Sequence, residues 1–96
     1  MIEKEIYLQA MCKNLITLRA AVGMTQEELA RHAGISRQTI VAAERENRLS
    51  WSTYLTLVFI FSQCYETKSL MEFLGIYPQE FIDQFQTKRD LEKEVF

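Results

Sequence analysis

The sequence predicts an all-α fold, and three observations lead to that prediction. Only three of the 96 residues are glycine and one is proline, whereas an all-β sandwich or barrel of this length needs many tight turns built from such residues. Apolar residues recur at steps of three and four, as they do on one face of a helix. Serine or threonine stands before several of these segments, in the position of a helix N-cap.

The first helix is expected over residues 2–22. Its apolar face contains six residues at helical spacing: Leu8, Met11, Cys12, Leu15, Leu18 and Val22. Gly23 follows, and glycine takes the left-handed conformation that ends helices without steric cost.

Two short helices with a tight turn between them come next. Thr25 is expected to cap the first, because Glu28 stands three residues later and completes a capping box. Gly34 ends that helix after little more than two turns, and Ser36 caps the second. The inner face of this second helix is expected to contain Ile40, Ala43 and Glu44. The outer face is expected to contain Arg37, Gln38, Val41, Ala42 and Arg45.

A fourth helix is expected to run through Cys64, after a polar loop over residues 46–50. Its run Leu-Val-Phe-Ile-Phe suits a buried strand as well as a buried helix. The length of the segment and the serines before it favour a helix, with Ser50 or Ser52 as the N-cap.

Residues 65–96 are expected to form two shorter helices. Thr67 is expected to cap the first and Gly75 to end it, and Pro78 is expected at the first position of the second. The apolar face of the second contains Phe81, Ile82 and Phe85. The mixed-charge tail over residues 88–94 either continues this helix or frays.

The chain offers little material for catalysis or metal binding. It has one histidine, no glycine-rich phosphate loop, no recognisable pair of catalytic carboxylates and no nucleophile elbow, so we expect neither an enzyme nor a cofactor. His32 has no cysteine or carboxylate at metal-ligand spacing and is expected at the surface. Cys12 and Cys64 lack CxxC spacing and are expected to be reduced packing residues. Neither a secretory signal nor a membrane span is evident, which predicts a cytoplasmic protein with no membrane partner.

The second and third helices have the arrangement of a helix-turn-helix. They meet at Gly34 and Ile35, and the small residues Ala30 and Ala33 are available where the helices must cross closely. The stretch from Leu15 to Arg45 resembles the Cro/lambda-repressor-type (XRE-like) helix-turn-helix family of bacterial and phage regulators. The sharpest elements are Leu-Arg before Gly, then Thr-Gln-Glu-Glu-Leu-Ala, Gly-Ile-Ser-Arg-Gln-Thr-Ile and Glu-Arg. The resemblance extends more weakly to about residue 63.

The resemblance implies that the second helix of the motif enters the major groove of double-stranded DNA. Carried onto this sequence, that helix begins after Ser36 and places Arg37 and Gln38 against base edges. Val41 and Ala42 follow one turn later and can contact thymine methyl groups. Many family members have a long polar side chain at the position of Ala42, so the operator sequence is not predicted.

The resemblance also implies contacts to the DNA backbone and one structural ion pair. The expected phosphate contacts are Gln26, Ser36, Thr39, Arg45, Asn47 and Arg48. Family members commonly have glycine after the position of Arg45, whereas this chain has Glu46, which a nearby phosphate would repel. Arg19 and Glu44 are expected to form an ion pair between the first and third helices.

The fourth helix is apolar nearly all round and must be covered on two sides. The family pattern directs one face into the motif core: Leu55, Val58 and Phe59. The other face needs a further cover: Tyr54, Leu57, Ile60, Phe61 and Cys64. We expect a DNA-binding domain over residues 1–64, with the motif at about 26–45. The extension over 65–96 is expected to pack on the fourth helix, to form a dimer interface, or both, through Leu70, Phe73, Leu74, Phe81, Ile82 and Phe85.

Some apolar surface is expected to remain and to form the interface of a homodimer. A dimer would suit the function, because one recognition helix reads too few base pairs for strong selectivity. Two recognition helices about 34–36 Å apart would read a palindromic operator. Trp51 is expected to be a packing anchor at the start of the fourth helix.

The net charge of −2 is unusual for a DNA-binding protein, but its distribution is not. Residues 13–48 carry a net charge of +2 and residues 49–96 a net charge of −3. The leading interpretation is therefore a transcriptional regulator, most simply a repressor. One alternative is an antitoxin, a phage switch or a restriction-control protein with the same DNA-binding fold. The other is a protein-interaction module that has lost DNA binding, which the acidic total charge and Glu46 favour.

Overall fold

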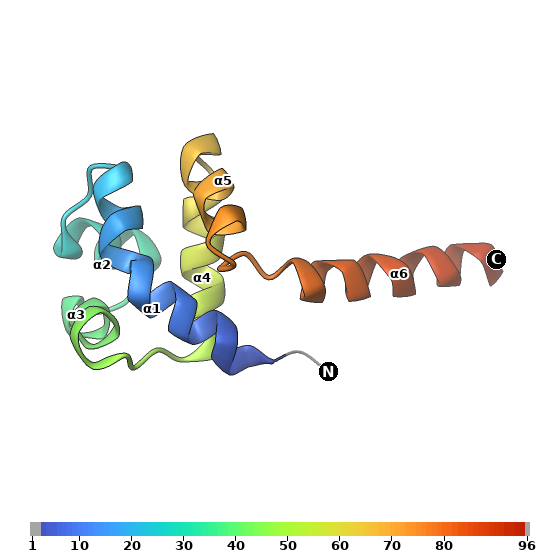
Figure 1. Cartoon of the computed structure of the whole chain (residues 1–96), viewed down its shortest axis with the longest axis horizontal. Helices are drawn as coiled ribbons and strands as arrows, with labels where there is room; N and C mark the ends of the chain where they lie inside the picture. The colour runs from blue at the N-terminus through green and yellow to red at the C-terminus, as the bar shows by residue number, and fades with distance from the viewer. Residues whose placement is uncertain (1–2, 96) are drawn as a thin grey trace.

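The computed structural model describes residues 3–95, with side chains described for residues 3–88. Within that range the regular secondary structure is helical, without a strand, as the sequence predicts. The helices are α1 (Lys4–Ala21), α2 (Gln26–Ala33), α3 (Arg37–Glu46), α4 (Trp51–Phe61), α5 (Tyr65–Phe73) and α6 (Gln79–Val95). Helices α1 to α5 form a packed body, and α6 projects from it (Figure 1). No helix of the described residues combines the length and apolarity needed to cross a bilayer.

The helix starts follow the cap residues in the sequence. The Thr25 hydroxyl accepts the Glu28 N–H (3.1 Å), and the Glu28 carboxylate accepts the Thr25 N–H (3.0 Å), which completes the predicted capping box. The hydrogen bond from the Thr25 N–H lowers the pKa of Glu28, because it favours the charged carboxylate. Ser36 caps α3, and Ser50 rather than Ser52 caps α4.

The helix ends are set by residues in the left-handed conformation. Gly34 has φ 69° after α2, where glycine adopts this geometry without strain. Asn47 has φ 55° after α3, and asparagine is among the few other residues that tolerate it. The predicted polar loop over residues 46–50 therefore begins one residue late, because Glu46 is still helical.

One hydrophobic core joins the five helices of the body. Its fully buried side chains come from α1, α2, α3, α4, α5 and the segment after α5: Met11, Leu15, Leu18, Leu29, Ile40, Ala43, Tyr54, Leu57, Phe61, Met71 and Ile76. The half-buried Trp51 ring stacks on Tyr54 with 4.8 Å between ring centroids, as expected of a packing anchor. Cys12 is buried and Cys64 half-buried, and both are free thiols. Burial raises the pKa of Cys12.

The face of α4 that enters the core was assigned wrongly from the sequence. Of the three residues expected there, Val58 is buried, Leu55 is half-buried and Phe59 is 68% exposed. The core face instead contains Tyr54, Leu57, Val58 and Phe61, at the i, i+3, i+4, i+7 spacing of one helix side. Helices α1 and α2 both pack against α4 and determine which side is covered.

The start of α5 also differs from the prediction. Helix α4 ends at Phe61 rather than Cys64, and α5 begins at Tyr65. Thr67 does not cap α5, because it lies within the first turn and is fully buried. Its hydroxyl donates to the Phe61 carbonyl (2.6 Å) and so ties the end of α4 to α5.

The two C-terminal helices behave differently from each other. Met71 of α5 is fully buried, and the Tyr54 hydroxyl donates to the Ile76 carbonyl, so α5 and the segment after it are fixed to the body. Helix α6 begins at Gln79, one residue after the predicted position, and leaves Phe81 and Phe85 42% and 59% exposed. Of the side chains offered as a cover for α4, Leu70 and Leu74 pack against the core, whereas Phe73, Phe81 and Phe85 are exposed. An amphipathic face predicts that something covers it but does not identify the cover.

Candidate DNA-binding surface

Helix α3 presents its outer face to solvent next to the turn from α2. Its inner residues Ile40 and Ala43 are fully buried, whereas Arg37 and Gln38 in the first turn are exposed. One turn later Val41 and Ala42 are half-buried on the outer side, and Arg45 is exposed at the end of the helix. The predicted division into inner and outer faces is confirmed by this burial.

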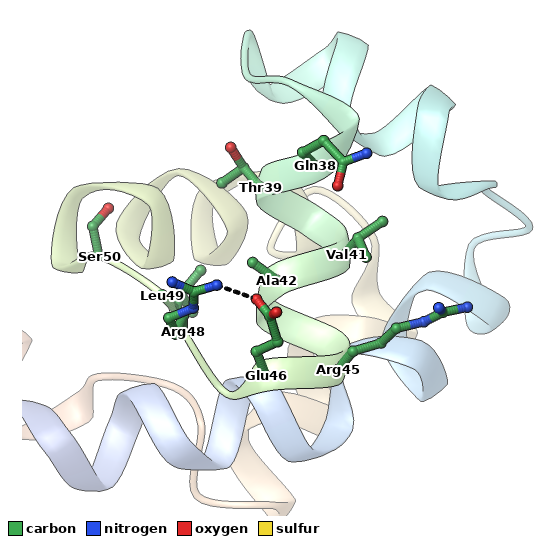
Figure 2. A pocket seen from close by; sticks show the side chains of 9 residues that line it. All are labelled: Gln38, Thr39, Val41, Ala42, Arg45, Glu46, Arg48, Leu49 and Ser50. Carbon is green, nitrogen blue, oxygen red and sulfur yellow. Dashed lines mark hydrogen bonds and ion pairs between the residues drawn. The ribbon is translucent and has the colours of Figure 1, made fainter.

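The outer face of α3 and the loop to α4 border an open hollow (Figure 2). Six of the ten residues expected to contact DNA line it: Gln38, Thr39, Val41, Ala42, Arg45 and Arg48. Leu49 and Ser50 also line the hollow and were not expected there. The serine before α4 was the available signal, since a capped helix start near α3 brings its free N–H groups to the same surface.

An ion pair between α1 and α3 holds this surface to the body. Arg19 Nε donates to Glu44 Oε2 (2.8 Å) and Arg19 Nη2 to Glu44 Oε1 (3.2 Å), so the contact is bidentate. Arg19 Nη1 also donates to the Met24 carbonyl (3.0 Å). The Glu44 side chain is 2% exposed and the Arg19 side chain 18%. The expected pair is thus present, and α3 is fixed against α1 and the turn before α2.

Gln26 continues this network to the exposed start of α3. Its Nε2 donates to Glu44 Oε1 (2.8 Å), and its Oε1 accepts from Arg37 Nη2 (3.3 Å). Hydrogen bonds therefore run from the ion pair through the first residue of α2 to the first residue of α3. The sequence does not predict the link from Gln26 to Glu44, because it depends on how α2 and α3 bring together two side chains that are 18 residues apart in the chain.

The start of α3 has the features of an anion-binding helix end. The Ser36 hydroxyl accepts the Thr39 N–H (3.3 Å) and lies 3.0 Å from the Thr39 hydroxyl. The remaining N–H groups of the first turn and the helix dipole favour a negative group there. The Ser36 hydroxyl is engaged as the cap. The groups that remain at this helix end to bind a phosphate are therefore mainly backbone N–H groups.

Glu46 pairs with a neighbouring arginine within the loop. Its carboxylate accepts from the Arg48 guanidinium, as Figure 2 shows, and this contact raises the pKa of Arg48. Both side chains are exposed, at 52% for Glu46 and 72% for Arg48. The ion pair offsets the charge of Glu46. It also engages the Arg48 guanidinium, which is expected to contact a phosphate.

The comparison with family models supports the interpretation of this surface. Residues 15–50 match the model described as helix-turn-helix. This segment is a helix-turn-helix of the Cro/lambda-repressor type. The match spans the second half of α1, all of α2 and α3, and the loop that leads into α4. Comparison with the curated proteins and with the solved structures found no match.

The helix-turn-helix is a DNA-binding module of transcriptional regulators, and the expected contacts are distributed around it in three places. Arg37 and Gln26 lie together at the first turns of α2 and α3, outside the hollow. Ser36 and Asn47 are exposed at the two ends of α3. The remaining six residues line the hollow itself.

The part of the chain that the structure describes contains no group of three or more His, Cys, Asp or Glu side chains that could hold a metal ion. His32 is exposed in the last turn of α2. The polar groups at this surface are guanidinium, amide, hydroxyl and backbone N–H groups, together with the Glu46 carboxylate.

Replacing Arg19 should destabilise the fold, because Glu44 would remain buried with only the Gln26 amide as a partner. We expect Arg19→Ala to lower the free energy of unfolding by about 3 kcal/mol, the lower end of the range for breaking a buried pair, since Arg19 is partly exposed. Urea unfolding of the full chain measures it. Arg45→Ala removes an exposed arginine and should change stability by no more than about 0.5 kcal/mol. Equal unfolding midpoints for Arg19→Ala and wild type would contradict this account.

Proposed function

We propose that this protein is a sequence-specific DNA-binding transcriptional regulator that acts by occupying its operator. One observation supports the proposal above the others. The inner face of α3 is buried in the core, and its Glu44 forms an ion pair with Arg19. Arg37 and Gln38 are exposed next to each other in the first turn. A rigid helix with long polar side chains at its exposed start is what major-groove recognition requires.

The chemistry of these side chains suits base recognition. The Arg37 guanidinium can donate two hydrogen bonds to O6 and N7 of guanine, and the Gln38 amide can pair with N6 and N7 of adenine. Arg37 gives one N–H to Gln26 and keeps others for a base. That hydrogen bond favours one orientation of a flexible side chain before DNA arrives, which reduces the entropy lost on binding.

The backbone contacts are expected around this helix. Gln26 and the first turn of α3 would contact phosphates on one side, and Arg45, Asn47 and Arg48 on the other. Because residues 13–48 carry a net charge of only +2, few phosphates are neutralised and non-specific affinity should be modest. We therefore propose a homodimer that places two copies of α3 on a palindromic operator and represses transcription, in the cytoplasm where its DNA target lies.

One further candidate function has a specific observation in its favour. Glu46 occupies Arg48, and the chain as a whole is acidic. Both features would suit a helix-turn-helix that has kept its fold and now binds a protein instead of DNA. The two functions differ in whether duplex DNA is bound with a steep dependence on salt.

Selection of bound sequences from a random pool of duplex DNA tests the proposal. The wild-type chain should enrich one half-site, repeated with inverted symmetry. In the enriched duplex, Arg37→Ala should lose about tenfold or more in affinity and relax the preference at one base pair, since a bidentate contact contributes about 1–3 kcal/mol of discrimination. Lys68→Ala on α5, away from α3 (Figure 1), is the charge-matched control and should bind as wild type.

Failure to enrich any sequence, with a folded protein by circular dichroism, would contradict the proposal and favour the protein-binding candidate. Enrichment that Arg37→Ala and Gln38→Ala leave unchanged would show that another surface recognises the DNA.

Removing the Glu46 charge should strengthen DNA binding. Glu46→Gln frees Arg48 for a phosphate and removes a repelling carboxylate, so the slope of log affinity against log salt should steepen by about one. Fluorescence anisotropy over a salt series measures that slope. Glu72→Gln on α5, an exposed position in the body, is the matched control. An unchanged slope for Glu46→Gln would mean that Arg48 does not contact DNA.

A further inference from the structure

The second turn of α3 presents apolar side chains to the hollow on its outer face. The hollow has a volume of about 690 Å³ and is open to solvent. Two of the apolar side chains come from α3 and one from the loop that follows it, and all three are half-buried; we call them the apolar strip: Val41, Ala42 and Leu49. Figure 2 shows Ala42 directed toward the loop that contains Leu49.

The polar groups around the apolar strip belong to other turns of the helix. Gln38 and Thr39 lie in the first turn of α3, and Arg45 and Glu46 lie in its last turn. The backbone N–H and carbonyl groups of the second turn form hydrogen bonds within the helix. The second turn therefore offers neither a donor nor an acceptor to a base edge in the major groove.

This absence limits which base can lie against the second turn. A helix in the major groove removes water from the base edges that it covers, and a donor or acceptor that then faces Val41 or Ala42 has no partner, which is unfavourable. Guanine, adenine and cytosine present hydrogen-bonding groups in this groove, whereas thymine also presents the methyl group on its C5 atom. A methyl group against the apolar strip is stabilised by burial.

We propose that the apolar strip recognises a methyl group on C5 of a pyrimidine, so that each half-site has thymine at the second turn of α3. The same surface accepts 5-methylcytosine, whose methyl group has the same position in the groove, and binding at this base pair therefore responds to cytosine methylation. The inference rests on the proposed function and deepens it by naming the base that α3 recognises beyond Arg37 and Gln38.

The position of this thymine follows from the spacing of residues along α3. One helical turn rises about 5.4 Å, and neighbouring base pairs are about 3.4 Å apart along the duplex. The thymine is therefore expected within about two base pairs of the pair that Arg37 recognises, which is the pair where Arg37→Ala relaxes the preference.

Fluorescence anisotropy of the full chain with the enriched duplex, at one salt concentration, tests the inference. Each thymine of the half-site is replaced singly by uracil, which removes only the methyl group. One replacement, at the expected position, should lower the affinity about fourfold, the effect of exposing one buried methyl group. Cytosine at that position should bind about fivefold or more weakly than thymine. Methylation of this cytosine at C5 should recover about fourfold.

Two variants of the apolar strip should lose the distinction between thymine and uracil. Val41→Ala removes two methyl groups from the strip, and Ala42→Gln places an amide in the open hollow, where it meets the base edge itself. Each should reduce the ratio of the two affinities to less than about twofold. Arg45→Ala on the next turn is the control and should weaken binding to both duplexes by the same factor, because a phosphate contact does not distinguish bases. Near-ultraviolet circular dichroism of Trp51 reports whether each variant is folded.

The outcomes separate this inference from the proposed function. An enriched half-site that no uracil replacement weakens would overturn the inference and leave the DNA-binding function standing. A methyl effect that persists in both strip variants would also overturn it, because another surface would then contact the methyl group. Failure to enrich any duplex would overturn both.

Discussion

The buried carboxylate of Glu44 is the constraint on which the recognition surface depends. With 2% of its side chain exposed, it requires the two guanidinium hydrogen bonds from Arg19 and the amide hydrogen bond from Gln26. These donors come from α1 and α2, so satisfying them fixes the rotation of α3 about its own axis. That rotation directs Ile40 into the core and leaves Arg37 at the surface. The ion pair behind α3 and the exposed Arg37 side chain are therefore connected, because Gln26 also accepts a hydrogen bond from Arg37.

Much of the fold could be predicted because its signals are local. Thr25 with Glu28, and Gly34 in the left-handed conformation, define where α2 begins and ends whatever the rest of the chain does. The failures concern features that depend on packing. A helix that is apolar all round has no periodic pattern, so the core face of α4 is decided by where α1 and α2 lie. Thr67 resembles a cap in the sequence, yet its hydroxyl serves a tertiary hydrogen bond to Phe61.

The outer face of α3 was equally predictable, since a helix with two buried positions has only one side left to expose. The order of residues in the motif pointed to Arg37 and Gln38 as base contacts and to the ion pair behind them. Two contacts could not be predicted: the hydrogen bond between Gln26 and Glu44, and the ion pair between Glu46 and Arg48. Both depend on distances between side chains, which the spacing of residues along the sequence does not define. The two halves of the chain differ in charge and position. The basic segment forms the surface that we propose for DNA, and the acidic segment completes the core and continues into α6, which projects from the body.

We propose that DNA binds on the first turn of α2, on α3 and on the loop that follows. The most direct measurement is a map of backbone amide chemical shifts for the isotope-labelled full chain as duplex DNA is added at low salt. The account predicts that the largest changes fall on residues 26–28, 36–42 and 45–50, with α5 unchanged. An absence of shifts, or shifts centred on α5 and α6, would contradict it.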